Sequence, residues 1–453
     1  MITRTVELSD DRLFYDFCGS AASYLERTVC EDAPSFSPQD FLFFDIETTG
    51  LSPKEAYIYL IGCIYESENG PVMTQLFSED PSEEEKILSA FCDLLRSHGL
   101  LIHFNGSTFD VPFVKARAGI YGIDVPLFWA GLDIYKVLKP YKELLGLKSM
   151  RMKAVEQYLG TAREDMYDGG ELIEVYIKYI SLKKLNRLKA SHDENDFPAA
   201  FLPDEPVQPG ASHRQVSVFS DYTGLRLIGD CSCNELLKIL LLHNYEDVIN
   251  MLSMGSLLDL AVFMSGNFVC SRFETVSSPN GSDRPAALLT ISVEKAVSGL
   301  FNDRILTPAR QKKGFNAVSS GGDLYNIRAR IMRSDTTDEL TFAIEPFEAE
   351  LKLFFADYRN YYYLVNEDYA IHKSIGMFMD RERCVKCTAS NCYARKSGMF
   401  LPVFEKKGGA LAEKAHLYRR SLQDKAFFIL ADDLAADPQV LYLYVRQLLN
   451  ALV

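Results

Sequence analysis

Two short and almost uninterrupted apolar runs constrain the fold of the first half of the chain more than any other feature. They are FLFFD at Phe41–Asp45 and YIYLIGCIY at Tyr57–Tyr65. Runs of this length, rich in aromatic and branched residues, are typical of strands that are buried on both faces of a sheet. Because helical patterns separate further strands, the sequence predicts an α/β domain with a central sheet. The further elements are expected as strands at 72–77, 100–104 and 132–135, and as helices at 81–97 and 111–121.

The sequence changes character twice after this α/β pattern. A proline-rich stretch at about 191–230 indicates a surface insertion, and a helix is expected after it at about 234–260, where Ser232 and Glu235 have capping-box spacing. In the last third, strand-like segments such as AALLTISV and LTFAIEPF dominate until a helix at 439–453. The expected parts are an N-terminal helical segment at 1–40, an α/β domain at 41–262 and a β-rich α+β C-terminal domain at 268–453.

The net charge of −14 argues against a uniformly basic nucleic-acid binder. The acidic surplus is concentrated, however, because residues 1–100 hold 6 Lys and Arg against 19 Asp and Glu. The remaining residues are nearly neutral, and the stretch 304–333 carries seven basic residues and a single acidic one, Asp323. Local charge is therefore the relevant scale for deciding which partners the chain binds.

The cysteines and the apolar runs predict a cytoplasmic protein that does not enter a membrane. Ten cysteines are scattered along the chain, and most of them, such as Cys63 and Cys92, lie inside apolar runs, which is typical of a reduced intracellular protein. The first residues contain no apolar signal core, and no run approaches 18 apolar residues.

Asp45 and Glu47 follow the first apolar run and are separated by one residue. Alternation along a strand sends both carboxylates to the same side. Two ionised carboxylates held close together repel each other unless a cation neutralises them, and Mg²⁺ and Mn²⁺ prefer oxygen ligands. A solvated strand end is the other interpretation of an isolated Asp-x-Glu.

Two further segments carry residues that fit the same chemistry. In HFNGSTFDVPF, Asp110 follows a turn at Asn105 and begins a helix, although a helix-capping Asp explains this pattern equally well. In LLLHNYEDVINML, His243 and Asp247 are four residues apart and share a helix face, whereas Tyr245 points to nearly the opposite side. A histidine on an apolar helix is commonly a core residue, but the carboxylate on the same face favours a functional site.

The ordered set Asp45-x-Glu47, Asn105-x-x-x-Phe109-Asp110 and His243-x-x-x-Asp247 resembles the three exonuclease motifs of the DEDD superfamily. Within it, the chain most resembles the YprB-like branch of predicted 3′→5′ exonucleases, related to the proofreading domain of family-B DNA polymerases. The stretch KAVEQYLGTAREDMYDG at 153–169 is similar to a segment of that branch. The resemblance implies a ribonuclease-H-like domain with a central mixed sheet and flanking helices.

One departure from the family pattern concerns the histidine. The polymerase-type motif has Tyr four residues before the last Asp, and another branch has His five residues before it. Here His243 stands four residues before Asp247. The spacing follows one branch and the residue type follows the other, which leaves the identity of the general base open.

The resemblance implies a phosphodiester hydrolase that uses two divalent cations, Mg²⁺ or Mn²⁺, and acts on ends of single-stranded DNA or RNA. Asp45 would bridge both ions, Glu47 and Asp247 would complete one site, and Asp110 would act at the second. His243 would orient or deprotonate the attacking water with a pKa near the working pH. The implied substrate contacts are Thr48, Leu51, Asn105, Phe109, Lys148 and Arg151, although Leu51 and especially Phe109 also fit a core position.

An acidic site needs basic residues nearby that bind the phosphate backbone. The stretch 304–333, together with the aromatic residues of 357–369, would suit a platform for a single strand. A solvated basic surface and ordinary core tyrosines are the alternative. The candidates outside that stretch are Lys115, Arg117, Lys136, Lys139, Lys142, Lys148, Arg151 and Lys153.

Cys384, Cys387 and Cys392 form the one clustered set of thiols. Zinc or an iron–sulfur cluster needs four ligands, and no second pair completes the set, so we do not expect either unless folding brings in His372 or Cys270. Two other functions remain open on the predicted fold. One is a non-catalytic module that binds nucleic acid or a protein partner, and the other is an endonuclease or phosphodiesterase.

Overall fold

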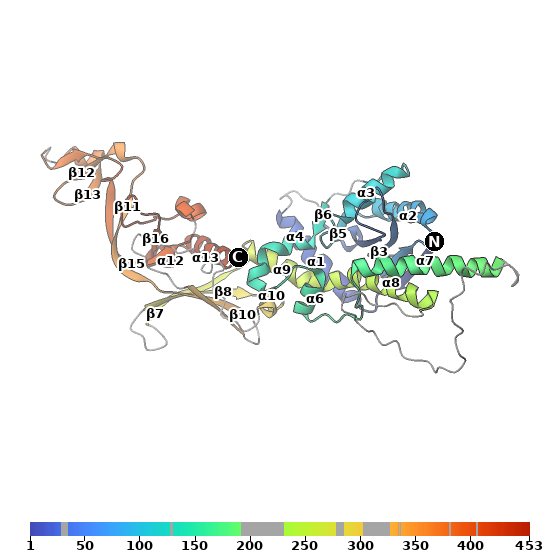
Figure 1. Ribbon diagram of the computed structural model, residues 1–453. Coiled ribbons are helices and arrows are strands. Elements are labelled where there is room, and N and C mark those ends of the chain that lie inside the picture. Colours follow the sequence, from blue (N-terminus) through green and yellow to red (C-terminus); the bar gives the residue numbers. More distant parts are fainter. Residues whose placement is uncertain are drawn as a thin grey trace, which may run out of the picture. The chain divides into compact units, whose positions relative to one another are not determined.

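The computed structural model describes residues 1–28, 35–126, 130–191, 231–277, 285–301, 327–333, 335, 337–379, 382–404 and 406–453. These residues form two compact units (Figure 1), Met1–Lys139 with Ser149–Leu258, and Pro140–Lys148 with Asp259–Val453. The expected insertion lies outside the described residues from residue 192 onward, and so does the part of the basic stretch at 304–326.

The first unit is built on a mixed six-stranded sheet. The three neighbours β2, β5 and β6 run parallel. On the other side of β2, the neighbouring pairs β1–β4, β4–β3 and β3–β2 are all antiparallel. This arrangement confirms the predicted α/β class with a central mixed sheet. In spatial order the strands are β1 (Ile2–Glu7), β4 (Gly70–Phe77), β3 (Ile58–Ser67), β2 (Phe41–Thr48), β5 (Leu100–His103) and β6 (Ala130–Asp133).

The expectation that residues 1–40 form only a helical segment is wrong. A helix, α1 (Asp11–Thr28), is present, but β1 precedes it and pairs with β4 along its whole length. Ile2 and Val6 are the half-buried residues of this edge strand, and their spacing of four also fits a helix face. A short edge strand with one solvated face therefore gives no clear signal in the sequence.

Helices cover both faces of the sheet, which explains why β2 reads as a continuous apolar run. Leu42, Phe44 and Ile46 pack toward α2 (Glu84–Ser97) and α3 (Asp110–Ile120). On the other face, Phe43 contacts Phe14 and Phe17 of α1, and residues of β3 pack against α7 (Gly169–Ser191) and α8 (Cys233–Ile249). The shorter helices of this unit include α4 (Ile134–Leu138) and α6 (Met152–Leu159), so the strand expected at 132–135 ends at Asp133.

Helix α8 begins with the predicted capping box, in which Ser232 and Glu235 bond each other's backbone N–H groups. It continues through a 3₁₀ turn into α9 (Gly255–Met264). By length and composition the helical stretch Cys233–Met264 passes the test for a membrane span, with a mean hydropathy of 1.4. Because 72% of its apolar window is buried inside the protein, it is typical of a core helix, and it carries His243 and Asp247.

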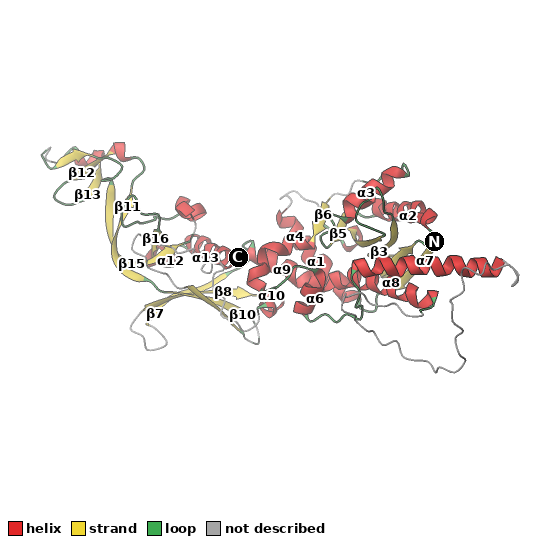
Figure 2. Cartoon of the chain, viewed as in Figure 1, coloured by secondary structure: helices red, strands yellow, loops and turns green. Residues whose placement is uncertain are grey.

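The second unit is β-rich (Figure 2), as predicted for the C-terminal region. Its strands pair antiparallel in all three sheets. Its helices are α5 (Lys142–Leu145), α10 (Lys295–Leu300), α11 (Lys373–Gly376), α12 (Ala431–Ala436) and α13 (Pro438–Leu452). Its strands, in sheet order, are β7 (Cys270–Ser277), β8 (Pro285–Val293), β10 (Asp338–Ile344) and β9 (Ile327–Met332); β11 (Phe347–Phe354), β15 (Tyr393–Val403) and β16 (Phe427–Leu430); and β13 (Tyr369–His372), β12 (Tyr361–Leu364) and β14 (Cys384–Lys386).

A buried ion pair joins the sheet of the first unit to two of its helices. Glu84 has no exposed surface, and it accepts hydrogen bonds from the backbone N–H of Ile58, the Arg117 guanidinium and the Tyr121 hydroxyl. Arg117 also donates to the carbonyl of Pro53. The geometry therefore assigns Arg117 to this cluster and not to the phosphate contacts expected from the sequence.

We expect Arg117→Ala to lower the free energy of unfolding by about 3–5 kcal/mol, because it leaves the Glu84 carboxylate buried without its counter-charge. Denaturant unfolding measures this loss. Lys86→Ala, which removes an exposed lysine from the same helix as Glu84, is the control and should change stability by less than about 0.5 kcal/mol. Equal stabilities of the two variants would show that the ion pair does not support the fold.

Candidate metal centre

Asp45 and Glu47 of the central strand β2 both face helix α8, as the alternation predicts. The Asp45 carboxylate accepts a hydrogen bond from the side-chain amide of Asn244 at 3.3 Å. Glu47 is almost fully buried, and its Oε1 lies 3.6 Å from Nε2 of His243. Both partners belong to α8, so the two carboxylates share one side of the strand.

The loop that follows β5 brings Asp110, the first residue of α3, next to the segment of β2 that carries Asp45 and Glu47. Its carboxylate accepts a hydrogen bond from the backbone N–H of Ile46, the residue between Asp45 and Glu47. The loop turns at Asn105, whose φ of 61° is left-handed. A Cβ on the next residue, Gly106, would lie 3.0 Å from Oδ2 of Asp110, so the close approach needs glycine.

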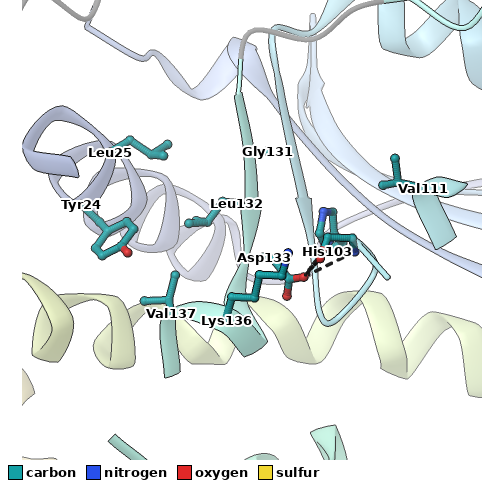
Figure 3. Close-up of a pocket in the computed structure, with 10 residues that line it drawn as sticks. Tyr24, Leu25, His103, Val111, Gly131, Leu132, Asp133, Lys136 and Val137 are labelled. Carbon is teal, nitrogen blue, oxygen red and sulfur yellow. Dashed lines mark hydrogen bonds and ion pairs between the residues drawn. The ribbon is translucent and has the colours of Figure 1, made fainter. Parts of the chain in front are cut away.

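Two buried side chains at the ends of β5 and β6 hold this loop (Figure 3). Asp133 accepts hydrogen bonds from the backbone N–H groups of Asn105 at 2.8 Å and Ser107 at 3.4 Å, and from the Ser107 hydroxyl. His103 accepts the N–H of Gly106 at Nδ1, and burial lowers the pKa of its imidazole to about 4 despite the Asp133 charge, so the ring is neutral. A cavity of about 420 Å³ beside them is lined also by Tyr24, Leu25, Val111, Gly131, Leu132, Lys136 and Val137.

His243 and Asp247 lie on one face of α8, as their spacing predicts. The distance from Nε2 of His243 to Oδ2 of Asp247 is 3.2 Å. One ligand atom from each of Glu47, His243 and Asp247 can be chosen so that all three lie within 4.8 Å of one another. Within the part of the chain that the structure describes, this is the one group of three or more such residues that could hold a metal ion.

Further charged residues come from α6 and the loop after it, and the sequence had given Glu156, Arg163 and Asp165 no individual role. Nδ1 of His243 lies 2.7 Å from Oδ2 of Asp165, which also receives a hydrogen bond from Lys153 at 3.0 Å. Arg163 binds both oxygens of Glu156 through Nη1 and contacts Asp247 through Nη2. Lys153 therefore pairs with a carboxylate beside the site, and its side chain is 43% exposed, so its expected phosphate contact stays a prediction.

The same loop is fastened to α8 by its backbone. The two carboxylate oxygens of Glu246 accept the N–H groups of Glu164 and Asp165, each at 2.8 Å. The resemblance of 153–169 to a family segment pointed to this region, but only the fold shows which charged residues of the run meet α8.

Burial and mutual repulsion perturb the carboxylates of the site. Burial, followed by the charges of Asp247 and Asp110, raises the pKa of Asp45 well above its ordinary value. Burial raises the pKa of Glu47 to about 8, against the opposing effect of His243, and raises that of Asp110 to about 6. Burial also acts to raise the pKa of Asp247, but the hydrogen bond and charge of His243 outweigh it and lower that pKa.

His243 differs from its expected behaviour. Burial acts to lower its pKa, but hydrogen bonds to Asp165 and Asp247 and the charge of Glu47 outweigh burial and raise the pKa to about 11. The expectation of a pKa near the working pH is therefore wrong for the metal-free chain, because three carboxylates surround the ring. The imidazolium and the Arg163 guanidinium supply positive charge that a bare acidic site would lack.

The donor set fits hard divalent cations. Asp45, Glu47, Asp110 and Asp247 offer carboxylate oxygens, which Mg²⁺ and Mn²⁺ prefer. Burial, with the charges of neighbouring carboxylates, raises the pKa values of Asp45, Glu47 and Asp110, and a bound cation would favour their ionised forms.

The residues assigned to substrate contact by resemblance lie in different surroundings. Thr48 donates to the carbonyl of Gly50 at 2.8 Å, and Leu51 after it is 85% exposed. Asn105 is exposed on the loop, whereas Phe109 is half-buried and packs on Phe113 with ring centroids 5.3 Å apart. Lys148 and Arg151 are exposed. Their substrate contacts remain predictions.

Two of the clustered thiols and several of the tyrosines of the second unit are engaged in packing. Cys387 and Cys392 lie in a cluster with Ala370 and neighbouring aromatic rings, and burial, followed by a hydrogen bond with Cys387, raises the pKa of Cys392 to about 12. Tyr361 stacks on Phe355 at 4.5 Å. In the described residues Cys384, Cys387 and Cys392 do not bring three ligand atoms within 4.8 Å of one another.

Comparisons with known proteins found similarities to a family model and to two DNA polymerases. A family model named RNase_H_2 and described as RNase_H superfamily matches residues 42–200, so the chain carries the predicted ribonuclease-H-like domain. A DNA polymerase of Methanocaldococcus jannaschii is 30% identical over 73 residues, which cover 15% of this chain and 4% of that protein. The solved family B DNA polymerase of Pyrobaculum calidifontis matches with a TM-score of 0.32 and 12% identity, over 51% of this chain and 27% of that one.

We expect His243 and His103 of the metal-free protein to have opposite protonation states near neutral pH. NMR titration in the presence of a chelator should show His243 still protonated at pH 8, since its pKa is about 11, and His103 neutral at pH 6, since its pKa is about 4. Asp165→Asn should lower the His243 pKa by removing its first hydrogen-bond partner. The variants His243→Gln and His103→Gln assign the signals.

The raised pKa also fixes the sign of the pH dependence of stability. The stabilisation from His243 and its carboxylates is complete below the unfolded-state pKa of about 6.5 and is lost as pH rises through about 11. A His243 signal that titrates near pH 6.5 in the folded, metal-free protein would contradict the described charge network.

Proposed function

We propose that the chain is a divalent-metal-dependent 3′→5′ exonuclease that hydrolyses phosphodiester bonds at the ends of single-stranded DNA or RNA. The observation that carries this proposal is the group of Glu47, His243 and Asp247, whose ligand atoms lie within 4.8 Å of one another. Asp45 and Asp110 lie outside that group but close enough for their charges to interact with each other and with Asp247. These residues come from β2, α3 and α8 of a ribonuclease-H-like domain. The 3′→5′ direction is supported by the order and type of the sequence motifs.

The four carboxylates would hold two ions, Mg²⁺ or Mn²⁺. When bound, such ions provide Lewis-acid stabilisation of a phosphoryl oxygen and lower the pKa of a bound water. The backbone N–H of Ile46 fixes the Asp110 carboxylate next to β2, and Asn244 fixes Asp45. Each contact holds one carboxylate against a group of another element, which keeps the oxygen donors of Asp45 and Asp110 in place.

His243 would orient the attacking water or exchange a proton with it. Its Nδ1 is held by Asp165, so only Nε2 faces Glu47 and Asp247. A ring fixed in this way can donate or accept a proton at one defined atom. Arg163 offsets the charge of Asp247 and connects the site to the buried Glu156.

We expect the purified full chain to shorten end-labelled oligonucleotides in Mg²⁺ or Mn²⁺ and to stop in a chelator. Asp45→Asn and Asp110→Asn should each lower the rate by more than about 100-fold, as when an electrostatic stabiliser of a catalytic site is removed. Asp93→Asn changes an exposed carboxylate of α2 in the same way and should keep the wild-type rate. Wild-type activity in Asp45→Asn with an intact fold would contradict the assignment.

The labels and the substrate distinguish the proposed activity from its alternatives. A 3′→5′ exonuclease releases a 3′ label at once and gives a descending ladder from a 5′ label, and matched DNA and RNA strands identify the preferred sugar. Cutting of a circular single strand would indicate an endonuclease on the same fold. Binding of the oligonucleotide without cleavage in either metal would indicate a non-catalytic module.

A further inference from the structure

A row of polar residues crosses the sheet of the first unit and ends at Asp45. The strand register places Arg4 of β1 opposite Gln75 of β4, Gln75 opposite Gly62 of β3, and Gly62 opposite Asp45 of β2. Residues directly opposite one another put their side chains on the same face of a sheet. Gly62 contributes no side chain to this row, and Asn244 of α8 fills its place.

Asn244 lies so close over Gly62 that a side chain at position 62 would displace the Asn244 amide. A Cβ there would lie 2.2 Å from Oδ1 of Asn244. The Asn244 amide accepts a hydrogen bond from Nε2 of Gln75 at 3.1 Å and donates to Oδ2 of Asp45 at 3.3 Å and to the Asp45 carbonyl at 3.4 Å. Asn244 and Gln75 are both fully buried.

The direction of every amide in the row is fixed by two groups that have a single hydrogen-bonding role. The Arg4 guanidinium can only donate, so Oε1 of Gln75 faces it at 3.0 Å. The backbone carbonyl of Leu241 can only accept, so Nε2 of Gln75 faces it at 2.8 Å. The second hydrogen of Nε2 then requires Oδ1 of Asn244, which leaves Nδ2 of Asn244 for Asp45.

The rows on either side of this one are mostly apolar. Two residues along β3 in one direction, Ile64 lies between Phe43 and Met73. In the other direction Leu60 lies between Phe77 and Glu47, the second carboxylate of β2. A buried amide among such neighbours is tolerated only while its hydrogen bonds are complete, since each unsatisfied group costs about 1–3 kcal/mol. The row is therefore a connected unit, in which the orientation of Asn244 depends on Gln75.

We propose that Asn244, oriented through Gln75 and Arg4, is a positioning residue that holds the Asp45 carboxylate for divalent-cation binding. The inference rests on the proposed metal-dependent function and deepens it. The amide fixes one oxygen and the main-chain carbonyl of Asp45 together, which restrains the side chain in one orientation. Loss of a residue that orients a metal ligand weakens metal binding by roughly 10–100-fold.

The variant Gln75→Glu tests the row without touching Asp45. Glu at this position still accepts the hydrogen bond from Arg4 but cannot donate to Asn244. We expect the Asn244 amide to turn over and present its oxygen to Asp45, which lowers the affinity for Mn²⁺ by roughly 10–100-fold in isothermal titration calorimetry. The added negative charge alone would strengthen cation binding, so the sign of the change separates the two effects.

Two more variants complete the experiment. Asn244→Ala removes the donor itself and should lower the Mn²⁺ affinity to a similar extent. Thr74→Val is the matched control, because buried Thr74 adjoins Gln75 on β4, faces the other side of the sheet and bonds Thr5 at 3.1 Å and Tyr65 at 3.2 Å. It should lower thermal stability and leave the Mn²⁺ affinity unchanged.

Mn²⁺ affinity in folded Gln75→Glu equal to or above that of the wild type would overturn the proposal, and so would unchanged affinity in folded Asn244→Ala. Circular dichroism of each variant establishes that it is folded. A wild-type chain that binds Mn²⁺ and loses affinity in both variants, yet cleaves no oligonucleotide, would uphold the row and remove the proposed activity. A wild-type chain that binds no Mn²⁺ would overturn both.

Discussion

Four carboxylates that lie near one another in a largely buried place repel one another, and hydrogen bonds and cationic groups around β2 offset part of that repulsion. Asp45 and Glu47 come from the central strand, Asp110 from the first turn of α3 and Asp247 from α8. Burial alone makes the charged forms costly, and close like charges add to the cost. The raised pKa values of Asp45, Glu47 and Asp110 express this strain, which a pair of divalent cations would relieve.

The protein offsets part of the repulsion with its own groups. His243 and Arg163 provide positive charge on the side of Asp247, while the row through Asn244 supplies a neutral donor on the side of Asp45. These two kinds of group affect metal binding differently. Cationic groups compete with a metal for the carboxylate, whereas an amide only orients it. Glu246 of α8 accepts hydrogen bonds from the backbone of the 160–168 loop, which keeps Arg163 of that loop in place.

The sequence predicted features that depend on spacing along one strand or helix. It did not predict features that depend on contacts between elements. The apolar runs predicted β2 and β3, and helix spacing predicted that His243 and Asp247 share a face, as found at 3.2 Å. Strand β1 was missed because an edge strand with one solvated face carries little pattern. The sequence predicted phosphate contacts for Arg117 and Lys153 because it does not show which acidic group a basic residue pairs with in the fold. The Gly62–Asn244 contact could not be predicted because it joins a strand to a helix far away in sequence.

The central claim is that the carboxylates of β2, α3 and α8 form one centre for two divalent cations. Anomalous diffraction from crystals of the protein grown with Mn²⁺ tests it most directly. The account predicts two manganese peaks about 3.5–4 Å apart, contacted by Asp45, Glu47, Asp110 and Asp247. Manganese bound elsewhere, or no peak between these carboxylates at millimolar Mn²⁺, would contradict it.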